Sequence, residues 1–125
     1  MSEYTKHLTP RPELRERIIE TAVKAFAAQG IKSITMDDIA TSLGISKRTL
    51  YEVFPDKETL LEECILRGQK EGDEYLKNVL ATSENVLEVL LKCYQRSIEK
   101  FHATNKKFFE DIKKYPKAYK LMTKR

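Results

Sequence analysis

A lone glycine, Gly44, separates two short apolar patterns in the stretch MDDIATSLGISKRTLYEVF, residues 36–54. This feature constrains the fold more than any other, because two short helices that cross at a wide angle need a tight turn between them. Glycine can take a left-handed backbone conformation there without a Cβ clash. Ala40, four residues earlier, is small and lets the helices approach closely. Apolar residues surround the turn: Ile39, Leu43, Ile45, Leu50 and Val53. The pattern predicts a helix-turn-helix.

Capping residues set the bounds of these two helices. Thr35 with Asp38 three residues later resembles a capping box at the start of the first helix. Ser46 can cap the second helix by accepting a hydrogen bond from a first-turn N–H. Pro55 ends that helix at the residue before it. The two helices are therefore expected to be short.

An amphipathic helix is predicted upstream of this pair. Residues 1–10 are expected to form a mobile arm, and Pro10 and Pro12 mark the start of the helix, where proline is tolerated. Its apolar residues recur every four positions, at Leu14, Ile18, Ala22 and Phe26. Gly30 is placed to end it. Together the three helices predict a three-helix bundle.

Helical patterns continue downstream. Asp56 can cap a helix that runs to about Leu80, with Gly68 and Gly72 as weak points. Later segments are expected over about 86–101, over about 106–115 and from Pro116 onward. With only 4 Gly, 4 Pro and few β-branched runs, the composition favours an all-α protein.

The length of 125 residues suits one domain, or a small domain with an incomplete second one. We expect a first domain over residues 1–66, which contains the helix-turn-helix, and a partial helical domain over 67–125. The net charge is +4, but residues 1–66 carry 9 Lys and Arg against 11 Asp and Glu, whereas residues 67–125 carry 14 against 8. Any DNA contact in the first half must therefore come from a local cluster of cations and not from overall charge.

Several classes of protein are disfavoured. No apolar run approaches the about 18 residues that span a membrane, and the N-terminus lacks the apolar segment of a signal peptide. Cys64 and Cys93 are far apart and are expected to be reduced, buried hydrophobes, although they could pair. We therefore expect a soluble, cytoplasmic protein.

An enzyme is the least favoured class. No Gly-rich phosphate loop is present, and neither His7 nor His102 has a Cys or carboxylate at catalytic or metal-binding spacing. No cofactor or metal is expected.

Polar residues open the second helix of the pair. Lys47, Arg48 and Thr49 fall in its first turn, which is the part of a recognition helix that reaches base edges in the major groove. Arg and Lys can donate to guanine O6 and N7 there, and Thr49 and Tyr51 can donate to phosphates. Lys57 opens the next helix, whose free N–H groups favour a phosphate. Each residue alone could equally belong to a solvated or half-buried face.

The set of residues, in this order, closely resembles the DNA-binding region of TetR-family transcriptional regulators. The resemblance covers about residues 14–66. The matching positions are Phe26, Gly30, Thr35, Ile39-Ala40, Gly44, Ser46, Thr49-Leu50-Tyr51, Phe54-Pro55, Lys57 and Leu60-Leu61.

The resemblance implies that residues 1–66 form a DNA-binding domain and that residues 67–125 form a partial helical regulatory domain. It implies a homodimeric regulator, most often a repressor, whose C-terminal helical domain binds a small ligand and releases double-stranded operator DNA. It implies that Lys47 and Arg48 contact bases and that Tyr51 contacts a phosphate or a base. The residues implied to contact the DNA backbone are Thr35, Ser46, Thr49 and Lys57.

Glu52 departs from the family pattern, which usually has residues favourable to DNA after Leu-Tyr. It lies four residues after Arg48, so the two can pair on one helix face and orient the guanidinium. Alternatively, Glu52 accepts from a cytosine N4. Either role is expected to lower non-specific affinity and sharpen discrimination.

The second departure is length, since family members continue with further helices that form the dimer interface. We expect a fragment or an unusually short member with an incomplete ligand pocket. From Lys100 to Arg125 the chain carries 9 Lys and Arg against Glu110 and Asp111. This basic tail is either a solvated face or a non-specific DNA-binding segment.

One alternative function stays open. A helical protein-interaction module could use the same fold without binding DNA, and the near-neutral first half supports it. The Lys47–Arg48 pair argues against this alternative, because such a module would not need two cations at that place.

Overall fold

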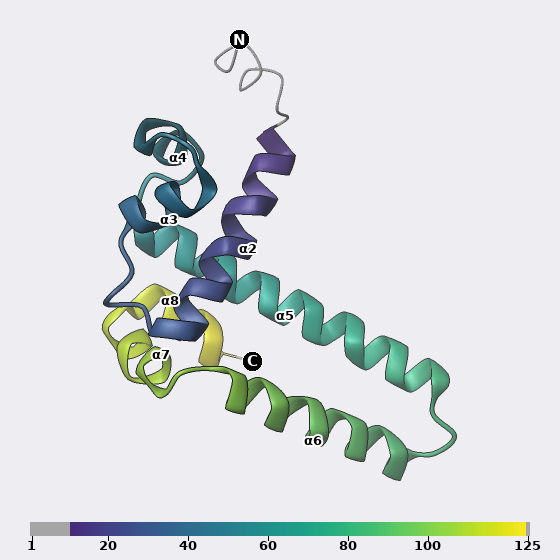
Figure 1. The fold of residues 1–125 in the computed structure, drawn as a ribbon. Helices are drawn as coiled ribbons and strands as arrows, with labels where there is room; N and C mark the ends of the chain where they lie inside the picture. Colours follow the sequence, from purple (N-terminus) through teal and green to yellow (C-terminus); the bar gives the residue numbers. More distant parts are fainter. Residues whose placement is uncertain (1–10, 125) are drawn as a thin grey trace.

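The computed structural model describes residues 11–124, so the predicted arm over 1–10 and Arg125 lie outside it. Within 11–124 every regular element is helical, as expected for an all-α protein (Figure 1). The elements are α2 (Arg11–Gln29), α3 (Met36–Leu43), α4 (Lys47–Val53), α5 (Lys57–Thr82), α6 (Val86–Ala103), α7 (Lys106–Asp111), the 3-10 helix η1 (Ile112–Lys114) and α8 (Pro116–Thr123).

The helix caps confirm the predicted starts of α3, α4 and α5. The Thr35 hydroxyl accepts from the Asp38 N–H at 3.0 Å, and the Asp38 carboxylate accepts from the Thr35 N–H at 2.9 Å, which completes the capping box. Ser46 accepts from the Thr49 N–H, and Asp56 from the Thr59 N–H. These side chains satisfy first-turn N–H groups that have no partner inside their helices.

The core joins α2, α3, α4 and the first half of α5. Its side chains are the apolar residues that the periodic patterns single out, and the fully buried ones include Ile18, Phe26, Ile39, Leu50, Leu60 and Leu61. The same core also contains Ile112 of η1 and Ala118 of α8. Two residues of the last quarter of the chain therefore pack among the helices of the first half.

The helix α5 is continuous from Lys57 to Thr82, across Gly68 and Gly72. It passes the expected boundary between residues 66 and 67 without a break. With α6 it forms an antiparallel hairpin that extends away from α3 and α4 (Figure 1). The division into domains over 1–66 and 67–125 stays a prediction.

The end of the chain differs in detail from the expected segments. The helix expected over about 106–115 ends at Asp111 and continues as the 3-10 helix η1. The segment after it is a helix, α8, with Pro116 in its first turn.

The helix α6 exposes many of its large apolar side chains. Its large exposed side chains are Val86, Leu87, Leu90, Leu91, Tyr94, Ile98 and Phe101. The Phe101 ring stacks on Phe109 of the neighbouring segment at 5.4 Å. Among the helices of residues 11–124, none combines the length and the apolar character that a membrane span requires.

Candidate nucleic-acid interface

The turn between α3 and α4 has the geometry that the lone glycine predicts. Gly44 has a positive φ of 70°, in the left-handed region. The N–H of Ile45 donates to the Ala40 carbonyl at 3.1 Å and closes the turn. Leu50 and Phe54 are buried and fix α4 on the core. The opposite side of α4 is left facing solvent.

The two predicted base-contacting cations, Lys47 and Arg48, lie on this exposed side. Arg48 is the more open, with 90% of its side chain exposed. The Lys47 ammonium lies 3.2 Å from the Asp37 carboxylate of α3, and both groups are well exposed. Such surface pairs are weak and can exchange for a new partner. Both cations are therefore accessible to a polyanion.

Hydroxyl groups lie beside these cations. Ser46 Oγ and Thr49 Oγ1 are 2.8 Å apart, and Ser46 Oγ also accepts from the Thr49 N–H at 3.0 Å. Thr35 lies at the start of α3, where its hydroxyl accepts from the Asp38 N–H. Since a hydroxyl both donates and accepts, each can cap its helix and still donate to a phosphate.

The last two predicted site residues are Tyr51, in α4, and Lys57, the first residue of α5. Tyr51 is 39% exposed. Lys57 is half-buried at the start of α5, and its ammonium lies 5.8 Å from the centroid of the Tyr115 ring. Burial lowers the pKa of Lys57, while the carboxylates of Asp111 and Asp38 act in the opposite direction. Lys57 therefore belongs both to the exposed end of α5 and to the contact with the C-terminal segment.

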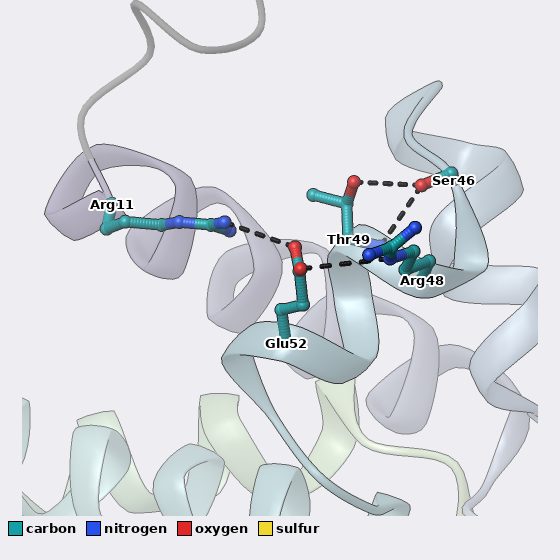
Figure 2. A network of polar contacts seen from close by, with 5 residues as sticks. All are labelled: Arg11, Ser46, Arg48, Thr49 and Glu52. Carbon is teal, nitrogen blue, oxygen red and sulfur yellow. Dashed lines mark hydrogen bonds and ion pairs between the residues drawn. The ribbon is translucent and has the colours of Figure 1, made fainter.

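Glu52 makes a contact that the sequence did not suggest. Its Oε2 lies 4.0 Å from Arg48 Nε, as the spacing of four residues predicts, and its Oε1 accepts a 3.1 Å hydrogen bond from Arg11 Nη2. Figure 2 shows the two arginines on opposite sides of the carboxylate. Arg11 is 41 residues away in sequence, so no local pattern relates it to Glu52. Its contact with Glu52, in the last turn of α4, makes it a candidate interface residue.

Carboxylates at the helix starts are held in their charged form. Hydrogen bonds from the backbone and side chain of Thr35 lower the pKa of Asp38, and those from Thr59 lower the pKa of Asp56. Both groups stay anionic near neutral pH. In this form they accept the capping hydrogen bonds more strongly than a neutral carboxyl would.

A cavity of about 530 Å³ lies away from this surface. Its walls come from α2, α5, α6, α7 and α8, and much of its lining is apolar: Val23, Phe26, Ile65, Phe101, Phe108, Phe109 and Met122. This volume is within the range of small-molecule sites. Within residues 11–124, no three His, Cys, Asp or Glu side chains are grouped so that they could hold a metal ion.

The fold and this surface define a helix-turn-helix protein that presents the first turn of its second helix to solvent. In this class of protein that turn enters the major groove.

Comparisons with known proteins agree with this class. The family model described as bacterial regulatory proteins of the TetR family matches residues 18–64. The transcriptional regulator YhgD of Bacillus subtilis is 32% identical over 101 residues, which cover 78% of this chain and 52% of YhgD. IcaR, the negative regulator of the biofilm operon icaADBC in Staphylococcus aureus, is 32% identical over 72 residues, which cover 58% of this chain and 37% of IcaR.

Solved structures show the same fold. A TetR-family regulator from Mesorhizobium loti superposes with a TM-score of 0.72 at 24% identity, over 93% of this chain and 61% of the other. The segment that the family model matches, residues 18–64, contains the helix-turn-helix and the positions at which the sequence resembles TetR-family regulators. The chain spans about half the length, or less, of the curated relatives that it matches.

Proposed function

We propose that this chain is a sequence-specific DNA-binding regulator of transcription that recognises an operator in double-stranded DNA through α4. The observation that carries the proposal is the exposed pair Lys47 and Arg48 in the first turn of α4, behind a turn closed by left-handed Gly44. An Arg or Lys at this place can donate to guanine O6 and N7.

The remaining site residues are assigned to the DNA backbone. Ser46 and Thr49 would donate hydroxyls to a phosphate beside α4, and Thr35 to one beside α3. Lys57, at the start of α5, would add a charge to the phosphate site made by the first N–H groups of that helix. Tyr51 would contact a phosphate or a base edge from the second turn of α4.

We further propose that the regulator represses and that it acts as a homodimer when it binds its operator. IcaR is named as a negative regulator, which supports repression for a chain that is similar to it. A dimer would present two α4 helices to half-sites about 34–36 Å apart. As a regulator that acts on DNA, it is expected to work in the cytoplasm.

Control by a small molecule is the last part of the proposal. The cavity adjoins α7, and Asp111 of α7 accepts from the N–H groups of Ile31 and Lys32 at 3.0 and 2.8 Å, just before α3. A largely apolar effector that displaces α7 would therefore disturb the support of the helix-turn-helix. The coupling would pass through this hydrogen-bonded contact.

The test is a selection of binding sites from a random duplex pool at two salt concentrations. The parent chain is compared with the double variant Lys47→Ala/Arg48→Ala. We expect the parent to enrich one motif, which the double variant loses, and a palindromic motif would support a dimer. Binding should also weaken steeply with salt, by about one unit of log–log slope for each phosphate contact.

A matched control separates α4 from the basic tail. The variant Lys113→Ala/Lys114→Ala removes the same two charges from η1. We expect it to keep the motif. Loss of binding by this control alone would assign DNA affinity to the tail, and an absence of enrichment by the parent would favour the protein-interaction module.

A further inference from the structure

The exposed side of α4 carries a carboxylate between two guanidinium groups. Glu52 Oε1 is 3.1 Å from Arg11 Nη2, and Glu52 Oε2 is 4.0 Å from Arg48 Nε (Figure 2). All three side chains are open to solvent, with exposed fractions of 59% for Arg11, 90% for Arg48 and 47% for Glu52. Exposed pairs of this kind add little to stability. The stability of the fold therefore does not explain the cluster.

The geometry of Arg48 is compatible with base contact while Glu52 stays beside it. The carboxylate lies on the Nε side of the guanidinium, and 4.0 Å is too long for a hydrogen bond. The two Nη groups can then donate to the O6 and N7 of a guanine. The two Nη groups could equally donate to two oxygens of a phosphate, but the negative charge of Glu52 repels a phosphate.

Arg11 extends the cluster from α4 to α2. It is the first residue of α2, and its hydrogen bond to Glu52 crosses between the two helices. The carboxylate therefore offsets the charge of two cations that could otherwise contact phosphates on any duplex. Phosphate contacts supply affinity without sequence information.

We propose that Glu52 is a specificity-determining positioning residue, which holds Arg48 and Arg11 so that binding depends on base edges more than on phosphates. This inference rests on the proposed function, because it assigns a role within the same DNA interface. Its consequence is a low affinity for non-specific duplex and a high ratio of specific to non-specific binding.

The test measures binding of Glu52→Gln to two duplexes: the motif selected by the parent and a scrambled duplex of equal length and composition. We expect about three- to tenfold tighter binding to the scrambled duplex, and a salt dependence for it that is steeper by about one unit. Affinity for the motif should change less, so the specificity ratio falls. When Arg48 is already replaced by alanine, Glu52→Gln should tighten binding to the scrambled duplex by a smaller factor. The effects of substitutions at two interacting residues are not additive.

The matched control is Glu63→Gln. Glu63 of α5 pairs with Arg15 of α2 at 2.8 Å, so this variant also removes one negative charge and one arginine contact between helices. We expect its specificity ratio to equal that of the parent. An equal rise in scrambled-duplex binding by both variants would reduce the effect to net charge and overturn the inference.

Two further outcomes would also overturn the positioning role while leaving the proposed function intact. One is an unchanged specificity ratio for Glu52→Gln beside a parent that selects a motif. The other is the loss of a cytosine preference at one position without tighter scrambled-duplex binding, which would make Glu52 a direct base reader. A parent that selects no motif would overturn the proposed function itself, and this inference with it.

Discussion

At Gly30 two constraints act on one residue. Its φ is +85°, and a Cβ built there would lie 2.7 Å from the Cβ of Lys107 in α7. The first constraint follows from the position at the end of α2, where a left-handed residue is common. The second arises because Asn105, just before α7, donates from its backbone N–H to the Ala27 carbonyl at 2.7 Å and from its amide to Ala28 at 3.2 Å.

We predict that Gly30→Ala lowers the free energy of unfolding by about 2–4 kcal/mol, since backbone strain and the clash with α7 add. The measurement is urea unfolding followed by circular dichroism. Gly68→Ala is the matched control, because Gly68 lies inside α5 and a Cβ added there would meet only open space. It should stabilise the chain by about 0.5–1 kcal/mol. Equal effects of the two substitutions would contradict the role of Gly30.

At the scale of single residues, the local features could be predicted from the sequence and a long-range contact could not. The lone Gly44, the caps at Thr35, Ser46 and Asp56 and the pairing of Glu52 with Arg48 are local features, so they could be predicted from spacing alone. The contact of Arg11 with Glu52 could not, because it depends on how α2 crosses α4. The roles of the site residues in DNA binding stay predictions.

Both α3 and α5 begin with a charged carboxylate that accepts a hydrogen bond at the start of the helix. Hydrogen bonds lower the pKa of Asp38 and Asp56 below the ordinary value of 3.8 in the folded chain. The unfolded chain therefore binds more protons as the pH falls through this range. The stabilisation is fully present above the ordinary pKa and is lost as the pH falls through the folded pKa.

We predict that Asp38→Asn/Asp56→Asn flattens the loss of stability below about pH 4. Asparagine keeps an oxygen that can accept from the same N–H groups, so both helices should still form at pH 7. The measurement is the midpoint of thermal unfolding between neutral and acid pH. A variant that loses stability in acid as steeply as the parent would exclude these two caps as the source.

The helix bounds that the sequence predicted least well lie near the end of the chain. The periodic pattern near residues 106–115 continues past Asp111, but the backbone tightens to the 3-10 helix η1. This tightening accompanies the burial of Ile112 in the core and the hydrogen bonds that Asp111 accepts from Ile31 and Lys32, between α2 and α3. Such long-range contacts override a local helical preference.

For the whole molecule, the shared core bears on how the chain unfolds. Ile112 of η1 and Ile39 of α3 are both buried in one apolar cluster. We predict that Ile112→Ala and Ile39→Ala each lower the free energy of unfolding by about 2–4 kcal/mol within one cooperative transition. Calorimetry together with circular dichroism would measure the effect.

Leu87→Ala provides the control, because Leu87 is 66% exposed on α6 and its truncation should change stability little. Two separate transitions, of which Ile112→Ala shifts only one, would support independent domains with a boundary near residue 66.

The contact between α7 and the end of α2 also has a consequence for synthesis. A ribosome adds about 5–20 residues per second, so residues 54–111, which follow α4, take about 3–12 seconds to synthesise. Until then Asp111 cannot accept from the N–H groups of Ile31 and Lys32, and Ile112 cannot fill its place in the core. Part of the apolar core of the nascent helix-turn-helix therefore stays in contact with water until the ribosome has synthesised this segment.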